Sequence, residues 1–343
     1  MNPDATPALY AARPEWADVE PVQQYEKANP LAPILYSEEY KDATDYLRGI
    51  VKAGEQSQRV LALTEHVIRL NPAHYSAWQL RYETLVALQA PLDVELKLMD
   101  ELADKFLKTY QVWHHRRLLL LLRGGGGGDT NAPPPVDAAE AELMFVEGIL
   151  RQDEKNYHTW AHRQWVLAFV NDDILWGGEL DFVDTMLNRD LRNNSAWHHR
   201  FFVVFASGVR EGEADRERVV RGELVYVKQH LSLAPNNASA WNYLRGVLEA
   251  GLLPLGTVKT FVEPYTVPLP SMARDLVDLE NPPPGPGAEL PCTAAVEFLA
   301  DVYEEEGGES TEKAVTLWRS LANEHDTIRK KYWEYRIREA VAK

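Results

Sequence analysis

Apolar residues recur every three or four positions along most of this chain, which is the spacing of helices that bury one face. One such run passes from Leu96 through Met99 to Phe106, and similar runs lie at 180–187 and 220–231. The alternating pattern of a half-buried strand is weak throughout. The chain is therefore predicted to be all-α.

Tryptophans mark an internal repeat within these helical runs. Five of them head similar segments at intervals of 35 to 47 residues, which is the size of a helical hairpin. The longest interval contains a glycine- and proline-rich stretch, 124–135, that reads as a low-complexity insertion. The tryptophans are Trp78, Trp113, Trp160, Trp197 and Trp241, and a sixth copy is expected at Trp333 beyond a degenerate region, 252–320.

Each tryptophan sits in a short motif that predicts the start of the second helix of a hairpin. The residue four positions before it is a good N-cap in four copies: Thr109, Asn156, Asn193 and Asn237. In the first copy, the pair Asn71-Pro72 is predicted to open the helix instead. An arginine follows the tryptophan by three positions in five copies and is expected to pack on the same helix face. The Trp241 copy departs, with Leu244 at that place and Arg245 one later.

A hairpin of this size cannot bury its own apolar face, so successive hairpins must stack. The expected architecture is an α-α superhelix, a crescent-shaped solenoid of helical hairpins. Residues 1–36 are proline-rich and are predicted to form an extended arm, followed by a repeat domain at 37–343. A second low-complexity insertion is expected at 281–291.

Composition narrows the possible partners. The formal net charge of −16 disfavours bulk nucleic acid and anionic membranes, which repel an acidic protein at long range. The single cysteine, Cys292, rules out an internal disulfide and fits a reducing compartment. The longest aliphatic run, 118–122, is too short to span a bilayer. These features predict a cytoplasmic protein with no membrane span.

Candidate chemistry lies five positions before the tryptophans, where three consecutive repeats carry Lys108, Lys155 and Arg192. Equivalent positions of a solenoid share one edge, at a spacing of about 10 Å. Each cation precedes the free amides of a helix N-terminus, so the row could bind a phosphate or carboxylate. The pattern alone leaves open that these are ordinary solvated surface charges.

Aromatic and histidine residues nearby allow two further interpretations. Tyr75, Tyr110 and Tyr157 stand three before their tryptophans, a position that is more often core than binding surface. His158 and His162 share a helix face, but the glutamate of a zinc-protease helix is missing. No metal site is expected in this chain.

The repeats resemble those of protein prenyltransferase α subunits. The resemblance rests on the segments 110–117, 156–165, 192–200 and 239–244. Two further segments, Glu15–Val22 and 326–335, are similar to the subtype shared by farnesyltransferase and geranylgeranyltransferase type I. Residues 252–320 and the glycine- and proline-rich insertions depart from the family pattern.

This resemblance implies a heterodimer with a β subunit that carries zinc and most of the isoprenoid pocket. The enzyme would move a farnesyl or geranylgeranyl group from its diphosphate to the cysteine of a protein ending in CaaX, such as a small GTPase, often with magnesium on the diphosphate. Lys155 matches the lysine that the family lends to the leaving group. The residues expected to line the substrate cleft with it are Tyr157, His158, Asn193, Gln111 and Tyr110, beside Lys108 and Arg192.

Two alternatives remain at this point. The α subunit of the Rab-specific geranylgeranyltransferase has the same repeats, although the Glu15–Val22 segment argues against it. A non-enzymatic tetratricopeptide adaptor would need Leu-Gly after the tryptophan, where this chain has pairs such as His114-His115.

Overall fold

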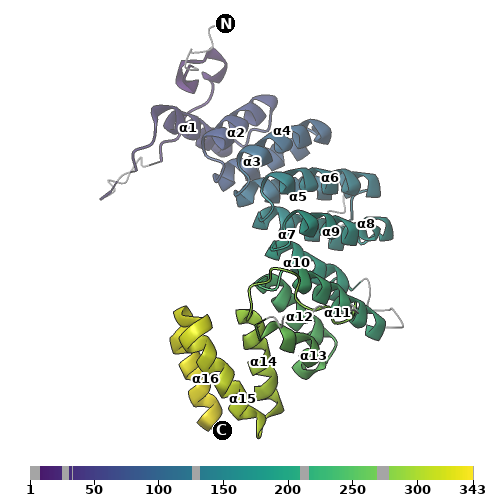
Figure 1. Cartoon of the computed structure of the whole chain (residues 1–343). Coiled ribbons are helices and arrows are strands. Elements are labelled where there is room, and N and C mark those ends of the chain that lie inside the picture. The colour runs from purple at the N-terminus through teal and green to yellow at the C-terminus, as the bar shows by residue number, and fades with distance from the viewer. Residues whose placement is uncertain are drawn as a thin grey trace. The chain divides into compact units, whose positions relative to one another are not determined.

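The structure, a computed structural model, describes residues 8–24, 31–32, 34–125, 132–208, 216–268 and 278–342. Every regular element in this part of the chain is helical, which confirms the all-α prediction (Figure 1). The chain divides into two compact units, Met1–Asn171 and Asp172–Lys343. None of the described helices is long and apolar enough to cross a membrane.

The first unit is a stack of helical hairpins. Helices α2 and α3, α4 and α5, and α6 and α7 pack as pairs, and the second helices of successive pairs, α3, α5 and α7, also touch one another. The bounds are α1 (Glu38–Ala53), α2 (Gln58–Leu70), α3 (Tyr75–Ala87), α4 (Leu92–Lys105), α5 (Tyr110–Gly124), α6 (Val136–Gln152) and α7 (Tyr157–Val170). The predicted stacking of hairpins is thus confirmed within this unit.

The second unit continues with the pairs α9–α10 and α11–α12, and ends in a compact group formed by α14, α15 and α16. The bounds are α8 (Asp173–Gly177), α9 (Glu179–Arg189), α10 (Asn194–Phe201), α11 (Arg216–Leu233), α12 (Ala238–Ala250), α13 (Lys259–Val262), α14 (Thr293–Glu306), α15 (Ser310–Ser320) and α16 (Lys330–Ala342). In this group Trp318 and Trp333 are fully buried in a separate apolar core. The degenerate region is therefore helical over much of its length.

The N-terminal arm is attached more closely than its proline-rich composition predicts. Residues 8–24 contain two short 3₁₀ turns that bury Tyr10 and Trp16 against α1 and α2. The Tyr10 amide donates to a carboxylate oxygen of Asp42 at 2.6 Å. Gly49 of α1 permits the approach, because a Cβ atom there would lie 2.5 Å from the carbonyl oxygen of Glu20. The arm thus covers the first helices of the stack.

The predicted insertion at 281–291 also packs against the protein. The Ser232 hydroxyl donates to the Pro283 carbonyl at 2.7 Å, and the Gly285 amide donates to the Ser232 carbonyl at 2.9 Å. The Tyr265 hydroxyl donates to the carbonyl of Pro282, which is buried. This segment is therefore a strap over the end of α11. The central part of the other predicted insertion, 126–131, lies outside the described residues.

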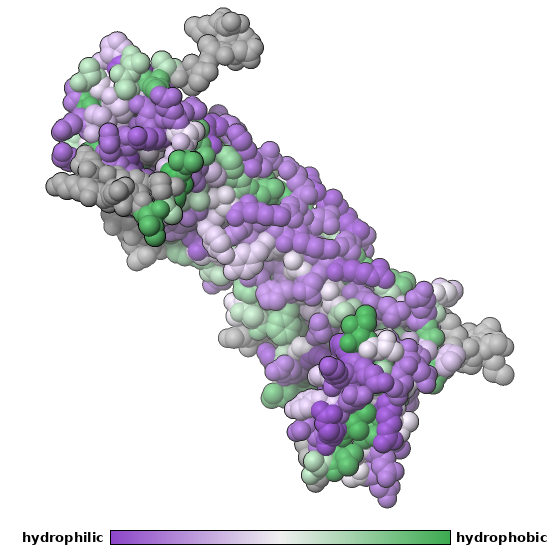
Figure 2. Space-filling model, turned by 90° about the vertical axis from the view of Figure 1, so that its left-hand side faces the viewer, coloured by the Kyte–Doolittle hydropathy of each residue, from purple (hydrophilic) through white to green (hydrophobic). Residues whose placement is uncertain are grey.

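The face drawn in Figure 2 is mostly hydrophilic, in keeping with the net charge of −16. Apolar patches interrupt it (Figure 2). Large exposed apolar side chains include Leu31, Ile34 and Leu35 of the predicted arm. Scattered apolar residues of this kind are normal on a protein surface.

Candidate functional site

The tryptophan of each repeat fixes the loop that precedes its own helix. In all five copies the indole Nε1 donates to the backbone carbonyl six residues earlier, at 2.7 to 2.9 Å. In the three copies headed by Trp113, Trp160 and Trp197, the accepting carbonyls are those of Leu107, Glu154 and Leu191. The next residues along the chain are Lys108, Lys155 and Arg192, so the indole holds the backbone directly before each predicted cation.

The predicted N-caps are confirmed as cap positions, with one correction. Asn156 and Asn237 accept backbone amides of their helices, whereas Thr109 occupies the cap position without a side-chain bond. The first copy was predicted wrongly, because Asn71 ends α2 and His74 caps α3, accepting the Ala77 amide at 3.2 Å. The Asn71 side chain accepts the Ala73 amide in a local turn, which takes it away from the helix start.

Four of the predicted site residues meet at the starts of α5 and α7. Lys108 is 83% exposed at its side chain, 3.9 Å from a carboxylate oxygen of Asp153. The rings of Tyr110 and His158 meet edge to face, with centroids 4.3 Å apart. Tyr157 contacts the same imidazole, with centroids 5.5 Å apart. Burial lowers the pKa of His158, against the opposing effect of a hydrogen bond to the Lys108 backbone, so this imidazole favours its neutral form.

The tyrosines three before each tryptophan are not core residues. Tyr75, Tyr110 and Tyr157 are 75%, 68% and 70% exposed. Large aromatic rings that a repeat keeps in solvent at one equivalent position favour a binding surface over packing. The structure therefore contradicts the core alternative, and the assignment of Tyr110 and Tyr157 to a substrate cleft stays a prediction.

The remaining predicted residues occupy the same loops or the neighbouring repeat. Lys155 is exposed directly before the cap of α7, and Gln111 is partly buried in the first turn of α5. Arg192 is exposed and borders a pocket of about 360 Å³ closed by the strap residues 285–289. Asn193 is fully buried, and its side-chain oxygen accepts the amides of Ser195 and Ala196. Since Arg192 and Asn193 belong to the second unit, a single row containing all three cations stays a prediction.

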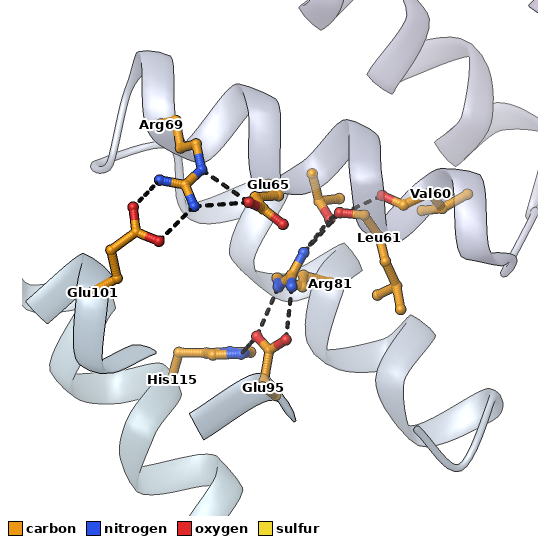
Figure 3. A network of polar contacts seen from close by, with 9 residues as sticks. Val60, Leu61, Glu65, Arg69, Arg81, Glu95, Glu101 and His115 are labelled. Atoms are coloured by element: carbon orange, nitrogen blue, oxygen red, sulfur yellow. Dashed lines mark hydrogen bonds and ion pairs between the residues drawn. The ribbon is translucent and has the colours of Figure 1, made fainter. Parts of the chain in front are cut away.

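A second polar system, which the sequence reasoning missed, runs through the interior. In three copies the arginine three after the tryptophan pairs with a buried glutamate from the following hairpin, in the pairs Arg81–Glu95, Arg116–Glu142 and Arg200–Glu223. The Arg81 guanidinium donates two hydrogen bonds of 2.7 Å to the Glu95 carboxylate, and His115 Nε2 lies 2.9 Å from the same carboxylate (Figure 3). Arg116, Glu142 and His162 repeat the arrangement. The histidines of the motif are thus partners of carboxylates.

These carboxylates are held ionised. Burial alone would raise the pKa of Glu95, but hydrogen bonds from His115 and Arg81 outweigh it and bring the pKa to about 2. Glu142 likewise has a pKa of about 2, because the attraction of Arg116 and the bond to His162 exceed the cost of burial. Burial lowers the pKa of His115 and His162, so both imidazoles are neutral donors to the carboxylates.

A spacing in the sequence could have revealed this system. Each glutamate stands 20 residues before the group that joins it on the next helix, in the pairs Glu95–His115, Glu142–His162, Glu179–His199 and Glu223–Tyr243. The last pair replaces histidine by tyrosine, whose hydroxyl donates to Glu223 at 2.6 Å. Among the described residues, no three histidine, cysteine or acidic side chains gather as a metal site.

The repeats match a known family model, the protein prenyltransferase alpha subunit repeat, in five segments: 57–88, 92–123, 139–170, 176–207 and 220–251. These coincide with the hairpins α2–α3, α4–α5, α6–α7, α8–α10 and α11–α12. The farnesyltransferase/geranylgeranyltransferase type-1 subunit alpha of Dictyostelium discoideum is 34% identical over 95% of this chain and 92% of its own length.

A solved structure and a more distant relative refine the assignment. The Candida albicans protein geranylgeranyltransferase-I complexed with GGPP contains a chain that is 29% identical, with a TM-score of 0.76 over 94% of this chain and 97% of that one. The mouse geranylgeranyl transferase type-2 subunit alpha matches only 38% of this chain and 22% of its own length, at 31% identity. The chain therefore belongs to the protein prenyltransferase α subunits, in the group of farnesyltransferase and geranylgeranyltransferase type-1 α subunits.

Proposed function

We propose that this chain acts with a β subunit to transfer a farnesyl or geranylgeranyl group to proteins that end in CaaX. In the reaction, the bond between the isoprenoid C1 and its diphosphate oxygen breaks, and a bond forms between C1 and the cysteine sulfur. The observation that carries the proposal is the exposed group of Lys108, Tyr110, Tyr157 and His158 at two adjacent helix starts. Family membership supports the reaction class.

The task of this chain is to stabilise the leaving diphosphate. Lys155, with Lys108 from the preceding repeat, supplies ammonium donors beside the free amides of α7 and α5, where a helix dipole also attracts anions. One well-placed donor to a developing anion is worth about 3 kcal/mol of transition-state stabilisation. Magnesium on the diphosphate would add to this effect. Arg192 extends the set of donors, and Asn193 contributes indirectly by holding the loop that Arg192 occupies.

The neighbouring aromatic surface is assigned to the substrate peptide. Tyr110, Tyr157 and the neutral His158 present exposed ring faces and polar edges, and Gln111 offers an amide for a peptide backbone or carboxylate. The β subunit is proposed to carry the zinc ion, which when bound lowers the pKa of the substrate thiol. We place this heterodimer in the cytoplasm, where the substrate cysteine is kept reduced.

The test is single-turnover transfer by the heterodimer, at saturating isoprenoid diphosphate and a CaaX peptide. Lys155→Ala and Lys108→Ala are made separately. The variant that lacks the lysine in contact with the leaving group is expected to transfer about 10- to 100-fold more slowly. The matched control is Lys97→Ala, which removes an exposed lysine from α4. If Lys155→Ala and Lys108→Ala both keep the full rate while the heterodimer stays intact, the assigned role of these lysines is wrong.

A further inference from the structure

The motif asparagine of one repeat reaches back to the loop of the repeat before it. Besides capping α7 through its oxygen, Asn156 donates its side-chain amide to the Leu107 carbonyl at 3.3 Å. In the second unit, Asn237 caps α12 and donates to the Leu191 carbonyl at 2.7 Å. The accepting residue in each case is the one directly before a predicted cation, Lys108 or Arg192. The same cross-repeat bridge therefore forms in both of these places.

Each of these carbonyls already accepts the indole of its own repeat. Trp113 donates to Leu107 and Trp197 donates to Leu191, both at 2.9 Å. A carbonyl oxygen has two lone pairs, so both donors can be satisfied at once. The backbone before the cation is thus held from both sides, by its own repeat and by the next one.

The bridge is absent from the first repeat, whose loop carries no cation. In the first repeat, the place of Lys108 and Arg192 is taken by Ala73. The following repeat has Thr109 as its cap, a residue without a side-chain amide that makes no cap bond. For these three loops, a cation and an asparagine bridge occur together or not at all. If the asparagine served only to begin a helix, no such link with the neighbouring loop would be needed.

The asparagines are themselves inaccessible to a ligand. Asn156 is 3% exposed and Asn237 is 1% exposed, whereas the Lys108 side chain is 83% exposed. A second contact joins the same two helix starts, since the rings of Tyr110 and His158 meet edge to face with centroids 4.3 Å apart. Any effect of the asparagines on catalysis must therefore pass through the loops they hold.

We propose that Asn156 and Asn237 are positioning residues. Each fixes the loop cation of the preceding repeat: Asn156 fixes Lys108, and Asn237 fixes Arg192. This inference rests on the proposed function of those cations. It makes the placement of a donor in one repeat depend on the repeat that follows. The Trp-and-Asn part of the motif then serves the reaction as well as the packing.

The test uses Asn156→Ser in the heterodimer. Serine keeps the cap acceptor but is too short to donate to the Leu107 carbonyl. We expect kcat for transfer to fall by about 3- to 10-fold, as expected for a displaced donor, with the KM for the CaaX peptide unchanged. In a Lys108→Ala background, Asn156→Ser should change kcat less than twofold, because the group it positions is gone.

A matched control separates this role from helix capping. Ser37→Ala removes a working cap at the start of α1, where the Ser37 hydroxyl accepts the Tyr40 amide. It should lower the melting temperature as Asn156→Ser does and leave kcat unchanged. The proposal is overturned if Asn156→Ser lowers kcat by the same factor with and without Lys108→Ala. It is also overturned if Ser37→Ala lowers kcat as much as Asn156→Ser does.

The bridge from Asn237 to the Leu191 carbonyl allows a second, independent double-mutant test if Asn156→Ser fails to fold. Asn237→Ser should lower kcat in the original chain but change it less than twofold in an Arg192→Ala background. Here the asparagine has no lysine as its direct neighbour in the sequence. If neither Lys108→Ala nor Arg192→Ala lowers kcat, the function proposed for the cations fails, and the positioning role fails with it. If the cations matter but the asparagine effects multiply with theirs, only the positioning role fails.

Discussion

The first and last copies of the tryptophan motif share the tryptophan and the arginine three residues later, but they differ in what these side chains contact. In the first copy, Arg81 pairs with Glu95 of the following hairpin, and the carboxylate also accepts from His115, so three helices meet at one buried ion pair. In the last copy, Arg336 pairs with Asp301 and Glu304 of α14, which lies earlier in the chain. The Arg81 contact reaches forward to the next hairpin, whereas the Arg336 contact reaches back to an earlier helix.

The tryptophans differ in the same way. The indole of Trp113 donates to the Leu107 carbonyl and so fixes the loop before Lys108. The indole of Trp333 donates instead to the Asp326 carboxylate at 3.1 Å. Packing is preserved at the end of the array, but the loop geometry that serves the candidate site is not. The motif therefore has two separable functions.

The largest expected effect is on the buried ion pair. Arg81→Ala leaves the Glu95 charge buried without its main partner, and should cost about 3–5 kcal/mol of unfolding free energy. Arg336→Ala removes a more exposed arginine and should cost about 1 kcal/mol. Urea unfolding of the full-length chain measures both. Adding Glu95→Gln to Arg81→Ala should recover much of the loss, and equal losses in the two single variants would contradict the comparison.

The covered N-terminal end should respond to a single methyl group. Gly49→Ala places a Cβ atom against the Glu20 carbonyl, and we expect a loss of about 1–3 kcal/mol as the arm is displaced. Gly148→Ala is the control, since it lies in a helix with open space around the position. That variant should gain up to about 1 kcal/mol from helix propensity. Unchanged protection of the arm from proteolysis in Gly49→Ala would argue against this attachment.

The two functions of the tryptophan can be separated by removing the indole donor. Trp113→Phe and Trp333→Phe should each lose about 1–3 kcal/mol of stability, because each removes a hydrogen bond and leaves a cavity beside the smaller ring. Only Trp113→Phe should also lower the transfer rate of the heterodimer, because only its bond holds the Lys108 loop. A rate loss of the same size in Trp333→Phe would mean that the effect is one of general stability.

Acid should weaken the interior repeats before it protonates their carboxylates. Burial lowers the pKa of His115 and of His162 in the folded chain. Below the ordinary histidine pKa of about 6.5, these side chains are therefore protonated in the unfolded chain but stay neutral in the folded one. Stability must then fall as the pH drops below that value. Glu95 and Glu142 add a further loss as the pH falls from about 4.5 towards 2.

The histidine part of this dependence can be tested between pH 7 and pH 5, which is above the carboxylate range. His115→Gln with His162→Gln keeps a donor for each glutamate but removes the titrating rings. The urea midpoint of this double variant should change less over that interval than that of the original chain. An undiminished slope would assign the acid sensitivity to other groups.

The sequence by itself determined the helical class, the hairpin period and the cap positions, because these follow from local spacing and from side chains that act within a few residues. It also indicated Lys108, Lys155 and Arg192, since equivalent repeat positions share an edge. It misassigned Asn71, because a local turn competes for its side chain. It also missed the glutamates, because their arginine partners lie 14 to 26 residues away on other helices.

Only the tertiary structure decided which polar groups are buried together and which are presented to solvent. The pattern Trp-x-His does not distinguish a metal ligand from a carboxylate partner, and packing selects the second for His115 and His162. The exposure of Tyr110 and the bridge from Asn156 to Leu107 likewise depend on how one hairpin stacks on the next. The bridge from Asn156 is made across repeats, so no spacing within a single repeat encodes it.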